Sequence, residues 1–293
     1  MLIIQLQGGV GNQMFQYAFA SILAKKNKTK LLIDGSFFKR IEKTPGFTPR
    51  KFELDIFDNP YFMASDLDVI SFHHLSNINK VKRKLGFHYP KIYEEPSFDF
   101  QTDALAIKSP VYLKGYFQSY KYFIAYEDFI RKLFSFPVDT LDVISKELLI
   151  TIKSSKTIAI HIRRGDYVSD KITAEYHGSC SVEYYLDAIK LLASKNKDFT
   201  LVFFSDDSDW VKEQFDDLSY SKIVVDHNNG EDSWKDMMLM SSCSHNIIAN
   251  SSFSWWAAWL NENPEKTVIA PKKWFKTKEL NTRTLLPQEW IKL

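Results

Sequence analysis

The sequence predicts an α/β protein with mostly parallel sheet, in two domains or in one large domain. Short apolar runs of β character alternate with stretches of helical periodicity along most of the chain. The length of 293 residues exceeds the usual size of one domain, which favours two. The composition is 45% hydrophobic, with 23 Phe, 14 Tyr and 7 Trp, which is enough apolar material for substantial cores.

The first elements follow a strand–helix–strand order. Residues 1–7 form a β-type run, a glycine-containing turn follows, and helical periodicity extends from Met14 to about Lys26. The run Leu31–Asp34 is the next predicted strand. The other elements expected in this half are a helix from Asp66 to about Leu85, a strand at Val111–Leu113 and a helix from Tyr120 to about Leu133.

After Pro137 the alternation becomes more regular, which indicates right-handed crossovers and a mostly parallel sheet. We place the domain boundary in this region and expect domains at 1–150 and 151–293. The predicted strands are Thr157–Ile162, Thr200–Phe204, Ile223–Val225, Ile247–Ala249 and Val268–Ala270. The predicted helices lie near 140–153, 182–196, 208–215, 233–241 and 252–262.

Charge and composition exclude several classes of protein. The net charge is +2, so a general nucleic-acid coat is not expected and any anion binding must be local. Cys180 and Cys243 are too few for a disulfide framework or a cysteine-built zinc site. No run approaches the roughly 18 apolar residues of a membrane span, and the N-terminus lacks a signal-peptide pattern. We therefore expect a cytoplasmic protein. The basic run at residues 80–84 is predicted to be a solvated helix face.

Polar clusters follow three of the predicted strands, at residues 161–164, 205–207 and 250–252. In parallel sheets, ligands bind beyond the carboxyl ends of the strands. Three clusters at equivalent strand ends therefore predict a binding site at one edge of the C-terminal sheet.

Arg163 and Arg164 directly follow a strand of core character. An unpaired buried charge is costly, so two adjacent arginines there indicate an anionic partner. Guanidinium forks match phosphate oxygens, which favours a diphosphate clamp. The alternative is a surface pair bonded to Asp166 or to loop carbonyls. His161, a lone histidine in the strand, is more often a hydrogen-bonded structural residue than a catalyst.

The N-terminal glycine loop has two interpretations. Gly9 and Gly11 supply half of a dinucleotide fingerprint, with Asp34 as a ribose-binding acid, but Met14 stands where the third glycine is required. A glycine loop at a helix N-terminus also lets backbone N–H groups approach a phosphate or sugar. The alternative is a tight strand–helix turn.

The later clusters also have structural alternatives. Asp207 and Asp209 could hold a divalent cation, but we favour capping of the following helix by Asp206 or Ser208. Ser251 or Ser252 is expected to cap the next helix, whose free N–H groups would point at an anion. Trp255 and Trp259 lie at i and i+4 and are expected in the core.

The segment from His161 to Tyr167 resembles the H-x-R-R-G-D-Y signature of the α-1,2-fucosyltransferases, glycosyltransferase family 11, in their bacterial form. The glycine-rich opening resembles the family's N-terminal motif. Together these two motifs are highly specific. Three further blocks are similar to the family, so the resemblance covers nearly the whole chain: residues 115–119, 204–207 and 250–256.

The resemblance implies a GT-B-like fold of two Rossmann-like lobes, with mostly parallel sheets and a cleft between the lobes. It implies an acceptor-side lobe at 1–150 and a GDP-fucose-binding lobe at 151–293. The implied reaction is an inverting transfer of L-fucose from GDP-fucose to the 2-hydroxyl of a β-galactoside. The acceptor would be an oligosaccharide, a lipid-linked glycan or a surface glycan. The resemblance implies no cofactor and no required metal.

The resemblance also implies roles for particular residues. Arg163 would contact the diphosphate, with Arg164 supporting it. The general base is not identified: Asp166 is a candidate by its location, but the better-supported role for Asp166 is to orient the arginine loop. Asp236 and Ser252 have the sixteen-residue spacing of a guanine-binding aspartate and a phosphate-contacting serine in related enzymes. His161 and Ser251 complete the expected GDP-fucose site. The loop expected near donor and acceptor contains Gly9, Gly11, Asn12 and Gln13. Phe253 departs from some relatives, which have Gln there.

Two other classes of protein remain as alternatives at this stage. A dinucleotide-binding oxidoreductase would use the glycine loop, and a non-catalytic nucleotide-sugar-binding protein would need the same arginine clamp without turnover. The expected partners are the donor and the glycan, without nucleic acid. Peripheral contact with the inner face of the cytoplasmic membrane is left open.

Overall fold

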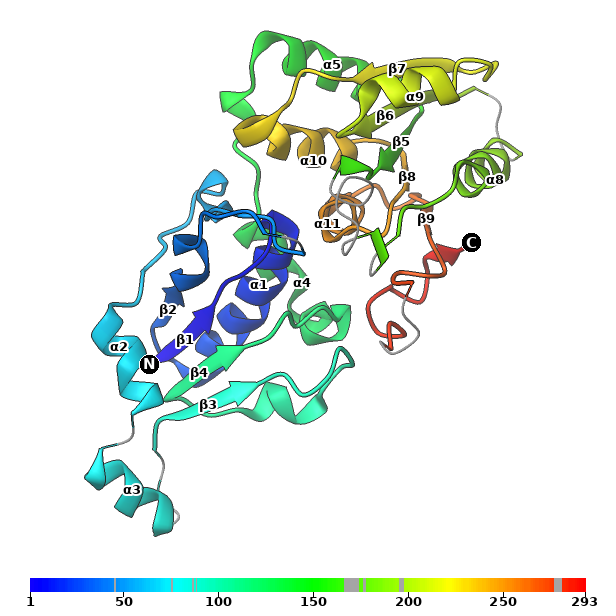
Figure 1. Ribbon diagram of the computed structural model, residues 1–293. Helices are drawn as coiled ribbons and strands as arrows, with labels where there is room; N and C mark the ends of the chain where they lie inside the picture. The colour runs from blue at the N-terminus through cyan, green and yellow to red at the C-terminus, as the bar shows by residue number, and fades with distance from the viewer. Residues whose placement is uncertain are drawn as a thin grey trace. The chain divides into compact units, whose positions relative to one another are not determined.

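The computed structural model describes residues 1–44, 46–74, 76–85, 87, 89–165, 174–175, 178–194, 198–276 and 281–293. The chain forms two compact units (Figure 1). The first contains Met1–Lys43, Pro49–Ser135 and Leu280–Leu286, and the second contains Thr44–Thr48, Phe136–Glu279 and Pro287–Leu293.

The main division falls after Ser135, earlier than the expected boundary at 150. The expected boundary lies inside helix α5 (Val143–Ser154). This helix belongs to the second unit because the carboxylate of Asp142, its N-cap residue, accepts a 2.9 Å bond from Lys235 of α10 (Ser233–Ser241). Both partners of this ion pair therefore lie in the second unit.

The first unit contains a four-stranded parallel sheet in the order β2-β1-β4-β3. Its strands are β1 (Leu2–Gln5), β2 (Leu31–Asp34), β3 (Lys91–Glu94) and β4 (Val111–Lys114). Its α-helices in the described part of the chain are α1 (Val10–Asn27), α2 (Asp66–His73), α3 (Asn77–Lys84) and α4 (Glu127–Leu133).

Three elements of this unit differ from the prediction, each for a local reason. Helix α1 begins at Val10 because Gly9 is its N-cap residue, so half of the glycine loop is the first helical turn. The long helix expected from Asp66 is two helices, because the chain is extended at His74 and the Ser76 hydroxyl accepts from a new helix N-terminus. The helix expected from Tyr120 begins with 3₁₀ turns, since the buried aromatic residues there do not share one helix face.

The second unit contains a six-stranded parallel sheet in the order β10-β9-β8-β5-β6-β7. The strands are β5 (Thr157–Ile162), β6 (Thr200–Ser205), β7 (Ser221–Val225), β8 (His245–Ile247), β9 (Val268–Ala270) and β10 (Ile291–Lys292). The described helices are α5, α8 (Val182–Ala193), α9 (Ser208–Gln214), α10 and α11 (Ser252–Leu260). The α/β class and the parallel sheets are confirmed.

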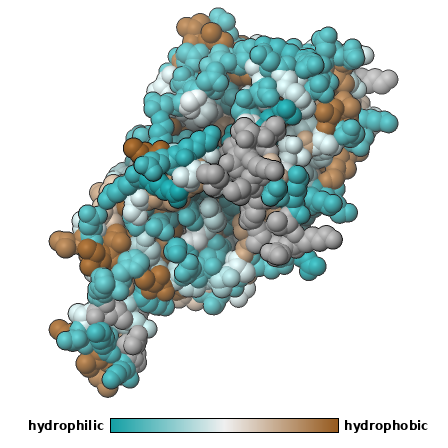
Figure 2. Space-filling view, in the orientation of Figure 1, coloured by the Kyte–Doolittle hydropathy of each residue, from teal (hydrophilic) through white to brown (hydrophobic). Residues whose placement is uncertain are grey.

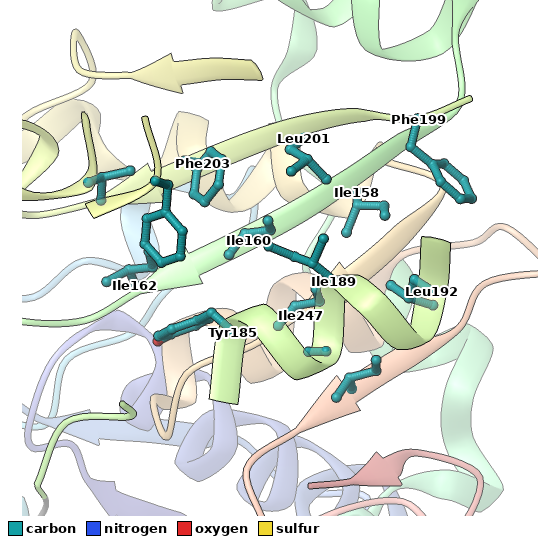
Figure 3. Packing of buried hydrophobic residues seen from close by; sticks show 14 residues of the cluster. Ile158, Ile160, Ile162, Tyr185, Ile189, Leu192, Phe199, Leu201, Phe203 and Ile247 are labelled. Atoms are coloured by element: carbon teal, nitrogen blue, oxygen red, sulfur yellow. The ribbon is translucent and has the colours of Figure 1, made fainter. Parts of the chain in front are cut away.

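Strand β5 is buried along its whole length and carries the core of this sheet. Side chains alternate between the faces of a strand, so Ile158, Ile160 and Ile162 share one face. Figure 3 shows them packed against Tyr185 and Ile189 of α8. The alternation places His161 on the opposite face. Strand β5 ends at Ile162, so the residues that follow emerge from a strand that is fully packed.

Within the part of the chain that the structure describes, no helix combines the length and the apolar character needed to cross a membrane.

Candidate functional site

Arg163 and Arg164 emerge at the carboxyl end of β5, and each is paired with an aspartate from the adjacent strand end. Arg163 Nη1 lies 2.8 Å from Asp206 Oδ2, and Arg164 Nε lies 2.9 Å from Asp207 Oδ2. The backbone N–H of Arg164 also donates to Asp206 Oδ1 at 2.8 Å. The guanidinium groups are therefore held in fixed directions, and about a quarter of each arginine side chain is solvent-exposed.

The pairing follows from the register of the sheet. Ile162 of β5 lies opposite Ser205 of β6, so the residues after both strands meet at one level. Arg164 also stacks on Trp210, with its guanidinium carbon 4.0 Å from the ring centroid. Such stacking suits a planar guanidinium far better than an ammonium group. Arginine is therefore the residue that this position requires.

Asp207 has a second role as the N-cap of α9. Its Oδ1 accepts from the Trp210 backbone N–H at 3.3 Å, so the cap is Asp207 rather than the expected Asp206 or Ser208. Asp206 instead pairs with Arg163 and accepts from the backbone N–H of Arg164. Among the described residues, no group of three or more His, Cys, Asp or Glu side chains is arranged to hold a metal ion.

Gly165 is required by the same packing. A Cβ at this position would lie 2.5 Å from Asp206 Oδ2, closer than any real contact. Any side chain would therefore displace the carboxylate that holds Arg163. The next residue, Asp166, and the rest of the segment through Thr173 lie outside the described residues. Among the described residues, Asp206 and Asp207 hold the two arginines in place.

His161 is only 6% exposed and lies against the ring of Phe253, with ring centroids 5.5 Å apart. The pKa of His161 is lowered to about 4, chiefly by burial; nearby Asp206 opposes this change and Arg163 adds to it. The imidazole is therefore neutral near pH 7. Its Nδ1 has no hydrogen-bond partner among the residues that the structure describes, so the expected hydrogen-bonded structural role is not complete.

Asp236 lies in the first turn of α10 and is half-buried. Burial raises its pKa to about 7, and the bond from Asn228 opposes that rise. Asn228 Nδ2 donates to Asp236 Oδ1 at 2.8 Å. This bond uses one carboxylate oxygen and fixes the plane of the group.

Asn228 is itself held by a chain of polar contacts that reaches α5. Its Oδ1 accepts from the Ser145 hydroxyl at 3.2 Å, and Ser145 lies 3.1 Å from Asp142. Asp142 is in turn paired with the buried Lys235, and this partner lowers the pKa of Asp142. The carboxylate of Asp236 is thus oriented by a network that spans two helices and a loop.

Helix α11 begins beside the carboxyl end of β8. Ser251 occupies the N-cap position, but its side chain makes no capping bond, in contrast to the expectation that Ser251 or Ser252 caps the helix. Ser252 is the first helical residue. Asn250 is 3% exposed and donates to the carbonyls of Gly178 and Trp274, so it supports the loops. Trp255 and Trp259 are buried and stacked, as predicted for core residues.

The glycine loop of the first unit is a tightly bonded strand–helix turn. Gly8 has φ +78° and a Cβ there would lie 2.4 Å from Asn12 Nδ2, so only glycine fits. Gln13 is fully buried and donates to the carbonyls of Gly8 and Lys51. Its side chain therefore fixes the loop. There is open space beside Gly9: a Cβ at this position would have a carboxylate oxygen of Glu53, 3.8 Å away, as its nearest neighbour.

Glu53 contacts this loop, although no motif around Glu53 in the sequence predicted a role at the site. The backbone N–H of Val10 bonds to its carboxylate, which is favourable at a helix N-terminus. Burial raises the pKa of Glu53, and nearby Arg50 opposes the rise. Gly11 is buried in the first turn of the helix. An acid at this end of α1 disfavours a phosphate there, so the loop suits a neutral group such as a sugar.

Asn12 is positioned by the end of the neighbouring strand β4. Gln118 Nε2 donates to Asn12 Oδ1 at 2.7 Å. The Gln118 segment is fixed by Glu95, whose Oε2 accepts from the backbone N–H groups of Tyr116 and Phe117 at 2.8 and 2.9 Å. Burial raises the pKa of Glu95 to about 7. These contacts join residues far apart in sequence, so no local pattern could reveal them.

Asp34 has a structural role, which argues against the dinucleotide alternative. It is 5% exposed and accepts from the Tyr112 hydroxyl at 2.6 Å and from the Ser36 N–H at 2.8 Å. A ribose-binding acid would need its oxygens at the surface of the site.

Comparison with known proteins agrees with this geometry. POFUT1 in complex with GDP-fucose has a similar fold, with a TM-score of 0.50 and 11% identity, over 91% of this chain and 96% of that one. The alpha-1,2-colitosyltransferase of Escherichia coli is 32% identical over 294 residues, covering 100% of this chain and 99% of that protein. The O-antigen biosynthesis glycosyltransferase WbnK of Escherichia coli is 33% identical over 305 residues, covering 98% and 99%.

The two units with parallel sheets have a fold of the GT-B type. The sequence pattern of glycosyl transferase family 11 matches residues 1–293, and the chain belongs to that family. The family resemblance inferred from the H-x-R-R-G-D-Y motif is thereby confirmed.

Proposed function

We propose that this enzyme transfers L-fucose from GDP-fucose to the 2-hydroxyl of a β-galactoside, with inversion at the fucose anomeric carbon. The observation that carries the proposal is the pair of arginines held at the carboxyl end of β5 in a family 11 chain. A diphosphate is the leaving group that matches two adjacent guanidinium forks. We assign donor binding to the second unit and acceptor binding to the first.

The arginines act on the charge that develops during transfer. As the acceptor oxygen attacks, the bond from fucose to the diphosphate breaks and negative charge grows on the departing oxygen. Arg163 and Arg164 lie in fixed directions because Asp206 and Asp207 hold them. Preorganised donors of this kind stabilise the transition state without reorganising during the reaction. Trp210 keeps the plane of the Arg164 guanidinium fixed as well.

Asp236 selects guanine in this proposal. An ionised carboxylate accepts from the N1–H and the exocyclic amine of guanine, a pairing that adenine does not offer. Asn228 fixes the orientation of the Asp236 carboxylate. The pKa of Asp236 is raised to about 7, and GDP binds the deprotonated carboxylate in this proposal. GDP affinity should therefore rise with pH through about 7.

A second donor has support from one relative. The alpha-1,2-colitosyltransferase is 32% identical over the whole chain, and colitose is L-fucose without its 3-hydroxyl. The arginine pair and Asp236 contact only the nucleotide part of either donor in this proposal. They therefore favour GDP-linked sugars without distinguishing the two.

The test is a transfer assay with each donor and a β-galactoside, in which GDP release and product mass are measured together. We expect GDP release coupled to product, with a higher kcat/KM for GDP-fucose. A 2-deoxy-β-galactoside is the matched control and should give no product. GDP binding without transfer to any galactoside would contradict the proposal, and a higher kcat/KM for GDP-colitose would replace the donor.

A further inference from the structure

Helix α3 presents an apolar stripe to solvent. Ile78, Val81 and Leu85 are spaced i, i+3 and i+7, which places them on one side of a helix. Their exposed fractions are 69%, 55% and 65%, and the following Phe87 is 63% exposed. Side chains of this kind are normally covered. Together with Asn77 and Lys82 they line an open hollow of about 740 Å³.

Positive charge surrounds this stripe. Lys80, Lys82 and Lys84 are exposed, and the helix turn places Lys82 on one flank of the stripe and Lys84 on the other. In Figure 2 the lower-left part of the molecule shows brown apolar side chains interleaved with teal hydrophilic ones.

The charge is concentrated in this part of the sequence. No Asp or Glu occurs from Val69 to Tyr93, whereas the same stretch contains Lys80, Lys82, Arg83, Lys84 and Lys91. The whole chain has a net charge of only +2, so the rest of it is net acidic. The apolar stripe and the excess positive charge therefore coincide in one short segment.

Helices α2 and α5 also carry exposed apolar side chains, but these stand beside acids. Leu67 of α2 is 79% exposed, but it stands between Asp66 and Asp68. Val143 of α5 is 71% exposed and follows Asp142. The combination of exposed apolar side chains with lysines and without acids distinguishes α3 from both helices.

We propose that α3 is a docking surface for an anionic lipid bilayer, with Ile78, Val81, Leu85 and Phe87 inserted at the interface and the lysines at the headgroups. Amphipathic helices bind membranes through buried apolar area together with attraction between basic residues and anionic lipids. A second copy of the chain is a poorer occupant. A symmetric contact would bring the same patch of positive charge against itself.

The test is co-sedimentation of the full chain with vesicles, which needs neither donor nor acceptor and so is independent of the proposed reaction. Vesicles of phosphatidylglycerol and phosphatidylethanolamine are compared with vesicles of phosphatidylcholine alone. We expect binding to the anionic vesicles only. The triple variant K80Q/K82Q/K84Q should bind on the order of 100-fold more weakly. The variant I78S/L85S should bind at least about ten-fold more weakly.

Helix α5 and the residue pair after it supply matched controls. V143S/I150S and K146Q/K153Q/K156Q change exposed side chains of the same kinds and should bind like the wild type. Thermal melts establish that all variants fold. Equal binding by wild type and α3 variants, or equal losses in the α5 controls, would overturn the proposal. It would also be overturned by vesicle-free self-association that I78S/L85S abolishes, which would make α3 an interface between copies.

Discussion

Asp236→Asn should stabilise the protein and weaken nucleotide binding at the same time. Burial raises the Asp236 pKa from 3.8 to about 7, so the ionised carboxylate is unfavourable in the folded protein. Three pKa units correspond to at most about 4 kcal/mol of folding free energy. The amide oxygen of the variant still accepts from Asn228, so the existing hydrogen bond survives. The variant therefore removes the cost of a buried charge without removing its partner.

The sign of the pH dependence is specific. Below about pH 4 Asp236 is protonated in both folded and unfolded chains, so wild type and variant should be equally stable. Between about pH 4 and 7 the folded wild type binds the extra proton, and its stability falls relative to the variant as pH rises. Above pH 7 the difference is constant. Each kcal/mol corresponds to about 2–4 °C in Tm for a domain of this size.

The nucleotide effect has the opposite sign. Loss of the charged acceptor and the introduction of an unmatched donor should weaken GDP binding by roughly 1–3 kcal/mol. Calorimetry at pH 6 and pH 8 should show affinity that rises with pH in the wild type and stays level in the variant. Melting curves at pH 4, 6 and 8 measure the stability difference on the same samples.

Asp226→Asn is the matched control. Its carboxylate pairs with Lys212 at 2.9 Å near the surface, and this partner lowers the Asp226 pKa. The control should therefore leave GDP affinity unchanged and give no gain in stability at pH 8. Unchanged GDP affinity in a folded Asp236→Asn protein would remove this residue from the site. A lower Tm than wild type at pH 8 would refute the buried-charge reasoning.

Three further predictions concern other parts of the site. Arg163→Lys keeps the charge but loses the planar fork, so kcat should fall by about 10²–10³-fold, with a smaller change in donor affinity. The control is Arg131→Lys, which changes an arginine that pairs with Glu127 at the surface. Wild-type kcat in the Arg163 variant would exclude the clamp. Glu95→Ala removes the acceptor of the Tyr116 and Phe117 N–H groups, so the free energy of unfolding from urea titrations should fall by about 1–3 kcal/mol. Turnover should fall as well. Normal turnover would show that this loop takes no part in the reaction. Transfer activity should persist in excess EDTA, because Asp207 caps α9 and holds Arg164; activity restored only by Mg²⁺ or Mn²⁺ would contradict this.

Sequence by itself determined much of the second unit, because its signals are local. Strands β5 and β9 and helix α10 have the predicted bounds, since each is an apolar run or a helical period with clear ends. The placement of Arg163 and Arg164 at a strand's carboxyl end followed from the same pattern. The family motif could be recognised for a similar reason, because its residues are contiguous.

Tertiary structure alone decided which residues hold the site in place. The partners of the arginines come from β6 because parallel register brings Asp206 and Asp207 to the end of β5, more than forty positions away in the chain. The same is true of Gln118 on Asn12, which is 106 positions away. Contacts across such separations leave no periodicity in the sequence. Burial, which sets the pKa of Asp236, is likewise a property of the packed chain, because it depends on what surrounds the carboxylate rather than on its neighbours in sequence.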